Sequence, residues 1–350
     1  MPFSALQAAE WCGGKIEGVP GQLFDSMESM EYAQANQMTF IGTAAYGRKF
    51  DQCPAGGAVC REGLSVPRRA DQTLIMVPDA DLAVAEILGK LAPPAPFPPI
   101  GVHATAIIAD TVTLGTGVRI GPYCVVQAGA SIGDHTVLMA QSFVGREARI
   151  GQECVLWPQV VVRDGCQLGN RVILHSGCVI GADGFGYRFA ESRHVKIPQI
   201  GGVIIEDDCE LGANTTVDRG KFSNTIIGQG SKLDNLVQVG HNVRLGKHTI
   251  LVAHVGIGGS VKAGDYLVAG GGAVVADHQT IGAGAQVAGF SAVVTDLAAG
   301  ERVAGAPARP AKQFFSELRA LHKLPALAQK IQQLEQRITE LESSTKNNSQ

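Results

Sequence analysis

Aromatic residues are scarce in this 350-residue chain, which contains 12 Phe, 5 Tyr and 2 Trp. Aromatic side chains contribute much of the packing in most globular cores. Their scarcity, together with 44 glycines, therefore indicates a core of another kind, regular and tightly wound.

Long apolar runs and an excess of charge are also missing. No 18 consecutive apolar residues occur, and the first segment, MPFSALQAAEWCGGK, has neither a basic start nor an apolar stretch. The sequence therefore predicts neither a membrane-spanning helix nor a secretion signal. We expect a cytoplasmic protein with no stable membrane insertion. The formal net charge of −3 gives no reason to expect nucleic acid as a partner.

The eight cysteines form no CxxC pair, so neither structural zinc nor a disulfide framework is predicted. Four of them are separated by multiples of six residues: Cys124, Cys154, Cys166 and Cys178. Such spacing indicates small buried side chains within a repeat. No cofactor and no metal are expected.

The strongest pattern is an aliphatic residue at every sixth position, from Val102 to Ile180 and again from Ile227 to Val293. A period of six fits neither an α-helix nor a free strand, but it suits a prism in which each side is one short strand and one corner. Three sides make a coil of 18 residues, and residues 18 apart should stack at about 4.8 Å. The sequence predicts a parallel β-helix, or β-solenoid, over residues 102–305.

The six-residue register slips twice. After Ile180 it returns one residue out of frame at Ile205, Leu211 and Val217, and it slips again before Ile227. Residues 181–202 form the first interruption and should leave the prism as a loop. Loops on a rigid scaffold often carry binding surface.

The flanking segments lack the repeat. Residues 1–91 mix helical stretches with strand-like ones and predict a separate small α/β domain, in which we expect helices at 4–10 and 80–91 and strands at 38–42 and 74–77. Residues 92–101, APPAPFPPIG, predict a stiff proline-rich linker.

The coil is expected to end at Gly305, Ala306 and Pro307, and residues 306–350 predict a helical segment broken near Pro325. Beyond Pro325, apolar residues recur with the 4-3 spacing of a short coiled-coil seam, at Leu327, Ile331, Leu334, Ile338 and Leu341. The polar residues 345–350 are expected to be disordered.

Five motifs carry a family resemblance: GADGFGY (181–187), KIPQIG (196–201), TTVDRG (215–220), LDNLVQVGHNV (233–243) and GAPARP (305–310). In this setting they resemble the UDP-3-O-(3-hydroxyacyl)glucosamine N-acyltransferases of lipid A biosynthesis, over nearly the whole chain. The resemblance implies a left-handed β-helix, a homotrimer with active sites in clefts between adjacent solenoids, and a uridine-binding N-terminal domain. It also implies transfer of a (3R)-hydroxyacyl chain from acyl carrier protein to the 2-amino group of UDP-3-O-acylglucosamine.

Acyl transfer to an amine requires a base for the amine's proton and a donor for the oxyanion of the tetrahedral intermediate. By resemblance, His241 occupies the position of the catalytic histidine. The 18-residue step places Gly259 one coil beyond His241, where a bare backbone N–H can approach the reacting carbonyl. The family pattern suggests that Asp234, one side of the prism earlier, orients the imidazole.

The resemblance also implies residues that bind the acceptor. Phe40 and Tyr46 match an aromatic pair that stacks on uracil. Thr43 stands where the family often has Asn, which puts a sugar contact in question. His278 lies at a second functional histidine, expected to contact sugar, phosphate or pantetheine.

Two further positions follow from the repeat. Steps of 18 residues put Gln238 and Ala292 in one column beside the catalytic motif, with Ala292 three coils beyond Gln238. We expect Gln238 to contact substrate and Ala292 to help set the length of the acyl chain. A small solenoid residue with no such role is the alternative for Ala292.

An acidic carrier protein requires a basic landing surface. Five basic residues cluster where the coil ends and the helix begins, namely Arg302, Arg309, Lys312, Arg319 and Lys323. A solvated helix face is the alternative interpretation of this cluster.

Other functions remain to be separated from the favoured one. An O-acyltransferase of the same pathway normally lacks a domain like residues 1–91, and an acetyl-CoA-dependent sugar N-acetyltransferase needs no long groove. A zinc hydratase on this fold requires closely spaced histidines, and no two of the nine here are five apart. A solenoid without catalysis is the remaining alternative.

Overall fold

The computed structural model describes residues 2–305 and 308–347. The chain divides into two compact units, Met1–Pro96 and Phe97–Gln350. Each unit has its own hydrophobic core, and each is described by itself.

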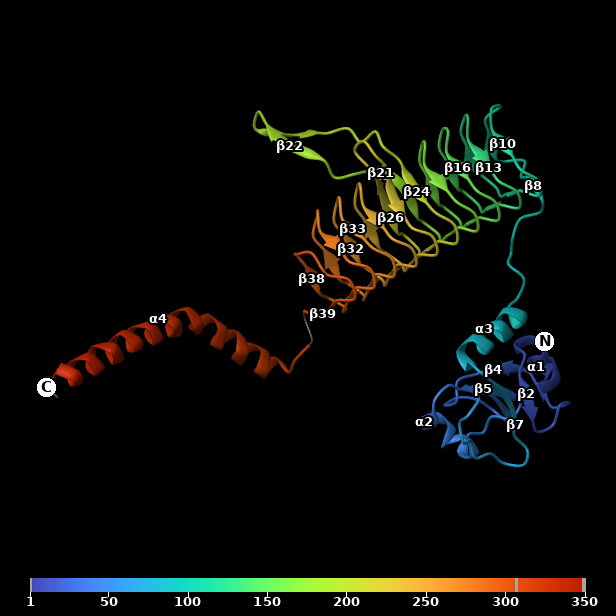
Figure 1. Ribbon diagram of the computed structural model, residues 1–350. Coiled ribbons are helices and arrows are strands. Elements are labelled where there is room, and N and C mark those ends of the chain that lie inside the picture. The colour runs from blue at the N-terminus through green and yellow to red at the C-terminus, as the bar shows by residue number, and fades with distance from the viewer. Residues whose placement is uncertain (1, 306–307, 348–350) are drawn as a thin grey trace. The chain divides into compact units, whose positions relative to one another are not determined.

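The N-terminal unit is built on a five-stranded sheet (Figure 1). Only β2 pairs antiparallel, with β7, and the pairs β7–β6, β6–β5 and β5–β4 are parallel. The strands of this sheet, in spatial order, are β2 (Lys15–Glu17), β7 (Thr73–Val77), β6 (Gly57–Arg61), β5 (Gln37–Ile41) and β4 (Ser26–Met27). A separate pair joins β1 (Phe3–Ser4) to β3 (Leu23–Phe24).

Helices α1 (Ala5–Cys12) and α3 (Ala80–Leu91) pack with this sheet around buried Phe3, Phe24 and Met38. Helix α1 begins at Ser4 with a capping box: the Ser4 Oγ accepts from the Gln7 N–H at 3.1 Å, and the Gln7 side chain accepts from the Ser4 N–H at 2.8 Å. The predicted helices and strands of this domain are confirmed to within two residues at each end. The short helices α2 (Ala44–Gly47) and η1 (Phe50–Gln52) follow β5.

Helix α3 ends at Leu91 and the first solenoid strand begins at Gly101. The last part of the proline-rich segment lies against the solenoid. The Phe97 ring is 6.4 Å from the Trp157 ring, and the Arg119 guanidinium donates to the Pro98 carbonyl at 2.7 Å.

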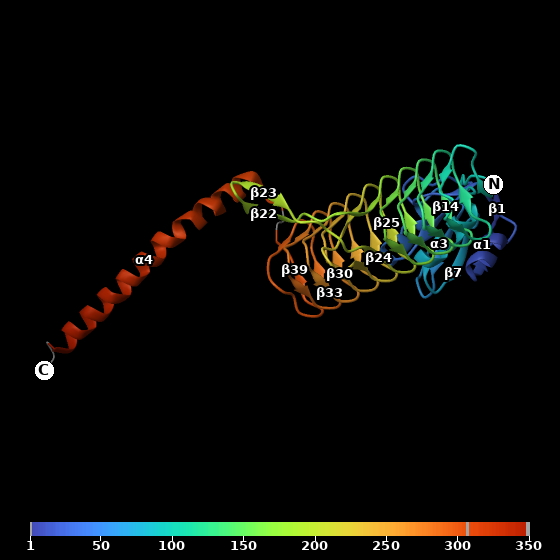
Figure 2. The same cartoon turned by 90° about the horizontal axis from the view of Figure 1, so that it is seen from above.

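The second unit is a three-sided parallel solenoid whose coils stack in one direction (Figures 1 and 2). We name each side by its first strand. The β8 side contains β8 (Gly101–Val102), β11 (Arg119–Ile120), β14 (Val137–Leu138), β17 (Val155–Leu156), β20 (Ile173–Leu174), β25 (Glu210–Leu211), β28 (Lys232–Leu233), β31 (Ile250–Leu251), β34 (Val268–Ala269), β37 (Gln286–Val287) and β39 (Arg302–Val303).

The other two sides have the same construction. The β9 side contains β9 (Ile107–Ile108), β12 (Val125–Val126), β15 (Phe143–Val144), β18 (Val161–Val162), β21 (Val179–Asp183), β26 (Thr216–Arg219), β29 (Gln238–Val239), β32 (Gly256–Ile257), β35 (Val274–Val275) and β38 (Ala292–Val293). The β10 side contains β10 (Thr113–Leu114), β13 (Ser131–Ile132), β16 (Arg149–Ile150), β19 (Gln167–Leu168), β24 (Val203–Ile205), β27 (Thr225–Ile227), β30 (Arg244–Leu245), β33 (Lys262–Ala263) and β36 (Thr280–Ile281).

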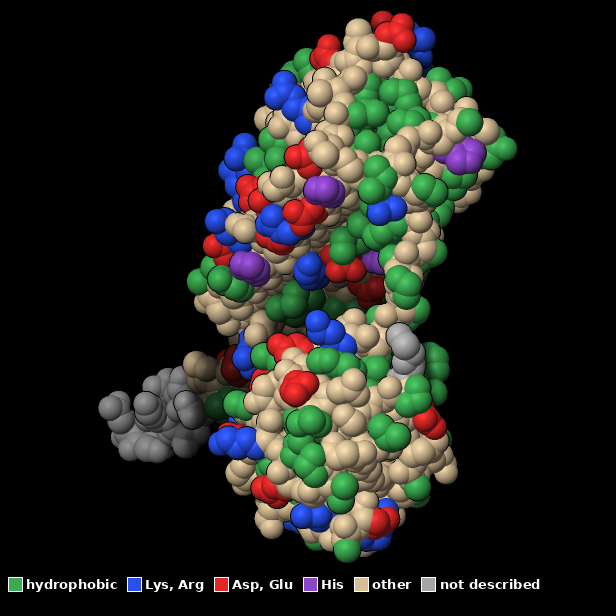
Figure 3. All heavy atoms as spheres, turned by 90° about the vertical axis from the view of Figure 1, so that its right-hand side faces the viewer, with side chains coloured by type: hydrophobic (Ala, Val, Ile, Leu, Met, Phe, Trp, Pro, Cys, Tyr) green, Lys and Arg blue, Asp and Glu red, His purple; other side chains and the backbone are tan. Residues whose placement is uncertain are grey.

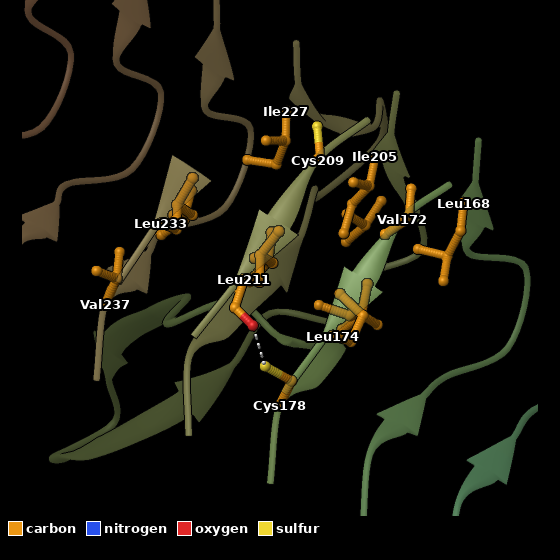
Figure 4. Packing of buried hydrophobic residues seen from close by; sticks show 14 of the residues in the cluster. Leu168, Val172, Leu174, Cys178, Ile205, Cys209, Leu211, Ile227, Leu233 and Val237 are labelled. Carbon is orange, nitrogen blue, oxygen red and sulfur yellow. Dashed lines mark hydrogen bonds between the residues drawn. The ribbon is translucent and has the colours of Figure 1, made fainter. Parts of the chain in front are cut away.

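The residues of the six-residue repeat fill the prism (Figure 4). Leu174 and Leu211, for example, are fully buried and are register partners in adjacent coils. Cys178 is buried in the same cluster and its thiol donates to the Leu211 carbonyl at 3.5 Å, while burial raises the pKa of this thiol to about 12. The hexapeptide solenoid and the buried place of the repeat cysteines are confirmed.

The outer surface of the solenoid is polar between its strand edges. On the face that Figure 3 shows, Lys and Arg side chains lie among Asp and Glu side chains. Ion pairs such as Arg146–Asp164 at 2.8 Å join neighbouring coils. Among the described residues, no helix combines the length and the apolar character needed to cross a bilayer.

Both register slips are insertions at the same corner, between the β9 and β10 sides. Leu168 pairs with Ile205, 37 residues later instead of 18, so 19 extra residues leave the coil. Ile205 pairs with Ile227, 22 residues later, so four more leave it. The long inserted loop (residues 184–202) carries a hairpin of β22 (Tyr187–Ala190) and β23 (Arg193–Lys196), which projects from the coils (Figure 1). The short inserted loop comprises residues 220–224.

Helix α4 (Ala311–Asn347) contains Pro325 in its interior, so the expected break there is wrong. A proline removes one helical hydrogen bond and causes a bend, but the residues on both sides continue the helix, and Figure 1 shows it bent. Residues 345–347 belong to this helix, so the disorder expected for them is also wrong. Ala306 and Pro307 at the expected end of the coil, and residues 348–350, lie outside the described residues.

Candidate active site

A cleft of about 550 Å³ lies at the corner where both inserted loops leave the coil. His241 comes directly after β29 at this corner, and the long inserted loop covers it from one side. A Cβ added to Gly184 of that loop would lie 2.5 Å from the His241 Cβ, so only a glycine permits this contact. The cleft is lined by Asp183, Phe185, Asp218, Gln238, Gly240, His241, Ile257, Gly258, Gly259, Asp277 and His278.

An ion pair fixes the base of the long inserted loop. The Lys196 ammonium pairs with the Asp183 carboxylate, and the Arg163 guanidinium lies 3.6 Å from the same carboxylate. The hydrogen bond and charge of Lys196 lower the pKa of Asp183. Two sequence motifs, GADGFGY and KIPQIG, are thereby joined next to the cleft.

His241 and Gly259 lie together, as the 18-residue step predicts. A Cβ on Gly259 would lie 2.8 Å from the His241 Nε2. The other ring nitrogen, Nδ1, is 3.1 Å from the Oδ1 of Asn242. The Nε2 atom therefore faces the Gly259 backbone.

The backbone N–H of Gly259 makes no hydrogen bond within the described residues. At the next β9–β10 corner positions of other coils, a carboxylate of the following coil accepts this bond: Arg146 donates to Asp164 at 3.1 Å. At other corners Lys247 donates likewise to Asp265 at 2.8 Å, and Thr116 to Asp134 at 2.7 Å. An N–H that is left without such an acceptor beside an imidazole is suited to bind an oxyanion.

Asp218, in β26, is a cleft residue that the sequence did not single out. Burial raises the pKa of its carboxyl to about 6, against the opposing effects of a hydrogen bond with the Gln238 side chain and of the His241 charge. No Lys or Arg forms an ion pair with it in the described part of the chain. A carboxyl in this environment is typical of functional sites.

The predicted substrate column is present on the β9 side. Gln238 pairs with Gly256, Gly256 with Val274, and Val274 with Ala292. Ala292 therefore lies three coils, about 14 Å, from Gln238 and is exposed. His278 lines the cleft with its side chain mostly exposed, 3.9 Å from the Asp277 carboxylate.

Asp234 lies elsewhere in the chain. It follows β28, at the corner between the β8 and β9 sides, where its carboxylate accepts from the N–H groups of Asn235 at 2.7 Å and Ala253 at 3.1 Å. It lines another hollow, of about 700 Å³, with His175 and Lys232. Within one chain the structure does not bring Asp234 to His241.

The aromatic pair of the N-terminal domain is on the surface. Phe40 is 40% exposed and Tyr46 54%, so neither is a core residue. Phe40 lies near the carboxyl end of β5 and Tyr46 in α2, which directly follows that strand. Carboxyl ends of parallel strands are common ligand sites. Thr43 is the N-cap residue of α2 and makes no capping hydrogen bond with its side chain.

The basic cluster is exposed but partly paired. Arg302, in β39, and Lys312, Arg319 and Lys323, on α4, are exposed. Arg309 forms an ion pair with Glu317, which reduces the charge that this cluster offers. Among the described residues no group of three or more His, Cys, Asp or Glu is arranged to hold a metal ion.

The fold and the histidine cleft between its coils define a transferase of the hexapeptide-repeat class. Residues 147–182 and 224–259 match the family model described as "Bacterial transferase hexapeptide (six repeats)". An Arabidopsis UDP-N-acetylglucosamine acyltransferase shares the fold, with a TM-score of 0.54 and 23% identity over 59% of this chain and 71% of that one.

Curated relatives extend the likeness to almost the full length. UDP-3-O-acylglucosamine N-acyltransferases of Syntrophotalea carbinolica and Porphyromonas gingivalis are 44% and 41% identical, over 97% and 99% of this chain and 98% and 99% of theirs. The protein of that name from Methylobacterium sp. is 48% identical over 42% of each chain, so that match spans less than half of the relative's length. This chain belongs to the UDP-3-O-acylglucosamine N-acyltransferase family and is an acyltransferase, which confirms the resemblance carried by the motifs.

Proposed function

We propose that the protein transfers a (3R)-hydroxyacyl chain from acyl carrier protein to the 2-amino group of UDP-3-O-acylglucosamine, giving UDP-2,3-diacylglucosamine for lipid A biosynthesis. Its near full-length relatives carry the name of this reaction. The single structural observation that supports it best is the juxtaposition of the His241 Nε2 with the Gly259 backbone.

The arrangement suits direct attack of the amine on the thioester. As the amine nitrogen bonds to the thioester carbonyl carbon, the His241 Nε2 takes its proton. The Gly259 N–H donates to the oxyanion of the tetrahedral intermediate. When that intermediate collapses, the C–S bond breaks, the carrier thiolate leaves and takes up a proton, and the amide remains on the sugar.

The column from Gln238 to Ala292 provides a path for the acyl chain along the β9 side. Its members are small or apolar beyond Gln238, namely Gly256, Val274 and Ala292. Phe40 and Tyr46 provide exposed ring faces for the uracil, and His278 provides a hydrogen-bonding group at the rim of the cleft. The basic cluster is the proposed landing surface for the carrier protein.

We also propose a homotrimer. The seam residues of α4 are about half exposed in the single chain, with Leu327 at 50% and Ile331 at 56%, and a packed seam would remove this apolar surface from water. In a ring of three copies, different sides of the prism face each other. Asp234 of a neighbouring copy then becomes available to the His241 cleft, which is how its predicted role is compatible with its place in the chain.

The test is to incubate the purified protein with UDP-3-O-acylglucosamine and hydroxyacyl carrier protein, and to identify the product by mass spectrometry. Transfer to the amine is expected, and His241→Ala should lower kcat by about 10²–10⁴, whereas His254→Ala, on an exposed corner, should not. Acylation of a hydroxyl of UDP-N-acetylglucosamine instead would indicate an O-acyltransferase. Use of acetyl-CoA alone would indicate an N-acetyltransferase.

A further inference from the structure

Asn242 joins the His241 imidazole to the short inserted loop. Its Oδ1 lies 3.1 Å from the His241 Nδ1 and accepts from the Lys221 backbone N–H at 3.0 Å. Its Nδ2 donates to the Ser223 Oγ at 3.1 Å and to the Ser223 carbonyl at 3.4 Å. The Asn242 backbone N–H donates to the Thr225 Oγ1 at 2.9 Å.

These partners fix which way the Asn242 amide points. The Lys221 backbone N–H can only donate and the Ser223 carbonyl can only accept. A flipped amide would set its NH₂ group against the Lys221 donor and its oxygen against the Ser223 carbonyl, and would lose both bonds. The Asn242 Oδ1 must therefore face His241.

The oriented amide in turn fixes the imidazole. The Asn242 Oδ1 is an acceptor, so the His241 Nδ1 must carry a hydrogen to complete the 3.1 Å contact. In a neutral imidazole the lone pair is then on Nε2. That atom faces Gly259 and the open cleft.

We propose that Asn242 is a positioning residue that holds His241 in the tautomer with Nε2 unprotonated, and that the short inserted loop holds Asn242 in place. The proposal rests on the proposed function, in which this Nε2 is the base. The register slip before Ile227 thereby acquires a purpose: its extra residues supply the Lys221 and Ser223 groups that bind the Asn242 amide. Asp234 cannot take this role within one chain, because it lies at another corner.

The backbone of Asn242 agrees with this role. Its φ is 62°, in the left-handed region that asparagine tolerates better than most residues. The equivalent positions of the next two coils, Ser260 and His278, have φ values of 63° and 62°. The corner conformation is therefore a property of the solenoid, and the hydrogen bonds of the side chain are what distinguish Asn242.

Two variants test the role by chemistry. Asn242→Leu removes the acceptor and should lower kcat about 10–100-fold with little change in KM for the UDP-sugar. Asn242→Asp retains an acceptor for the Nδ1–H and should recover much of this loss. Its added negative charge favours the imidazolium, so the acidic limb of its profile of kcat/KM against pH should move to higher pH. The other ionisable groups that face His241, namely Asp183, Asp218, Asp277, His278 and Lys221, are unchanged in both variants.

Asn170→Leu is the matched control. Asn170 is also half-buried, and its Oδ1 accepts a hydrogen bond between coils, from the Gln152 N–H at 3.0 Å, far from the cleft in the sequence of coils. Its substitution should cost comparable stability with unchanged kcat. Equal kcat losses in Asn242→Leu and Asn170→Leu would overturn the proposal.

The tautomer can be read without substrate. In protein labelled with ¹⁵N-histidine, the spectrum of the wild type compared with that of His241→Gln identifies the His241 signals. A protonated Nδ1 and an unprotonated Nε2 are expected in the neutral ring, and the reverse assignment would overturn the proposal. Because this measurement needs no turnover, absence of acyl transfer to the proposed acceptor would contradict the proposed function while leaving the tautomer result intact.

Discussion

The His241 Nε2 lies so close to the Gly259 backbone that a methyl group on Gly259 would be 2.8 Å from it. Real Cβ atoms do not approach heavy atoms within 3.0 Å, so either the ring or the coil must move to admit a side chain at position 259. A glycine is required at this position by contact and not by backbone conformation.

Gly259→Ala should therefore lower kcat by about 10²–10³, because the methyl group displaces the base and obstructs the oxyanion position together. Gly271→Ala is the control, since a Cβ there would meet its nearest atom at an ordinary 3.4 Å. Steady-state kinetics and melting temperatures of both variants make the comparison. Full activity of Gly259→Ala would remove Gly259 from the site.

Asp218 gives a prediction for stability against pH. The pKa of its carboxyl is about 6 in the folded chain, above the ordinary value of 3.8. Proton binding to Asp218 therefore favours the folded state: this contribution is present below pH 3.8 and is lost as pH rises through about 6. Asp218→Asn should raise the melting temperature at pH 8 by a few degrees, with a smaller gain at pH 5. A gain that is equal at both pH values would show that burial of the charge is not the cause.

The uracil contact is tested by the double variant Phe40→Ala, Tyr46→Ala. Stacking would be present in both the ground state and the transition state, so KM for the UDP-sugar should rise several-fold while kcat changes little. Tyr32→Ala, at a residue of the same domain that is 70% exposed, should leave KM unchanged. An unaltered KM in a folded double variant would assign the uracil to another site.

Ala292→Met tests the length of the acyl groove. Filling a groove with a longer side chain costs about 1–3 kcal/mol, so the variant should prefer shorter donors than the wild type does. Ala288→Met, which places the same side chain at an exposed position after β37, is the control. Competition between carrier proteins with graded acyl chains measures the preference, and identical profiles for the wild type and Ala292→Met would end the ruler hypothesis.

The solenoid was predictable because its register is written locally. An inward aliphatic residue at every sixth position fixes the side, the face and the coil of each strand, and the pairing of Gln238 with Gly256 follows from counting alone. The same counting brings Gly259 to His241. Pro325 was misinterpreted because local helix propensity in a long segment outweighed the one hydrogen bond that proline removes.

Asp218 escaped the sequence for a physical reason. In the regular repeat its neighbour would be residue 236, but the short inserted loop lengthens the step to 22 residues, as in the pairing of Val217 with Val239. Asp218 thereby lies beside Gly240 and His241, which no 18-residue step connects. Asn242 was visible in the motif VGHNV, yet its role depends on the folded path of residues 221–223.

The two insertions leave the prism and return without disturbing the stack. Leu174 pairs with Leu211 across the first and Leu211 with Leu233 across the second, as cleanly as Leu233 pairs with Leu251 where nothing is inserted. Loop length is thus uncoupled from coil geometry, and a chain of this architecture can gain or lose residues at this corner while the base keeps its floor and its ceiling. Homologous sites in such proteins are best aligned by coil and side, because separation along the sequence is the quantity that this architecture leaves free to vary.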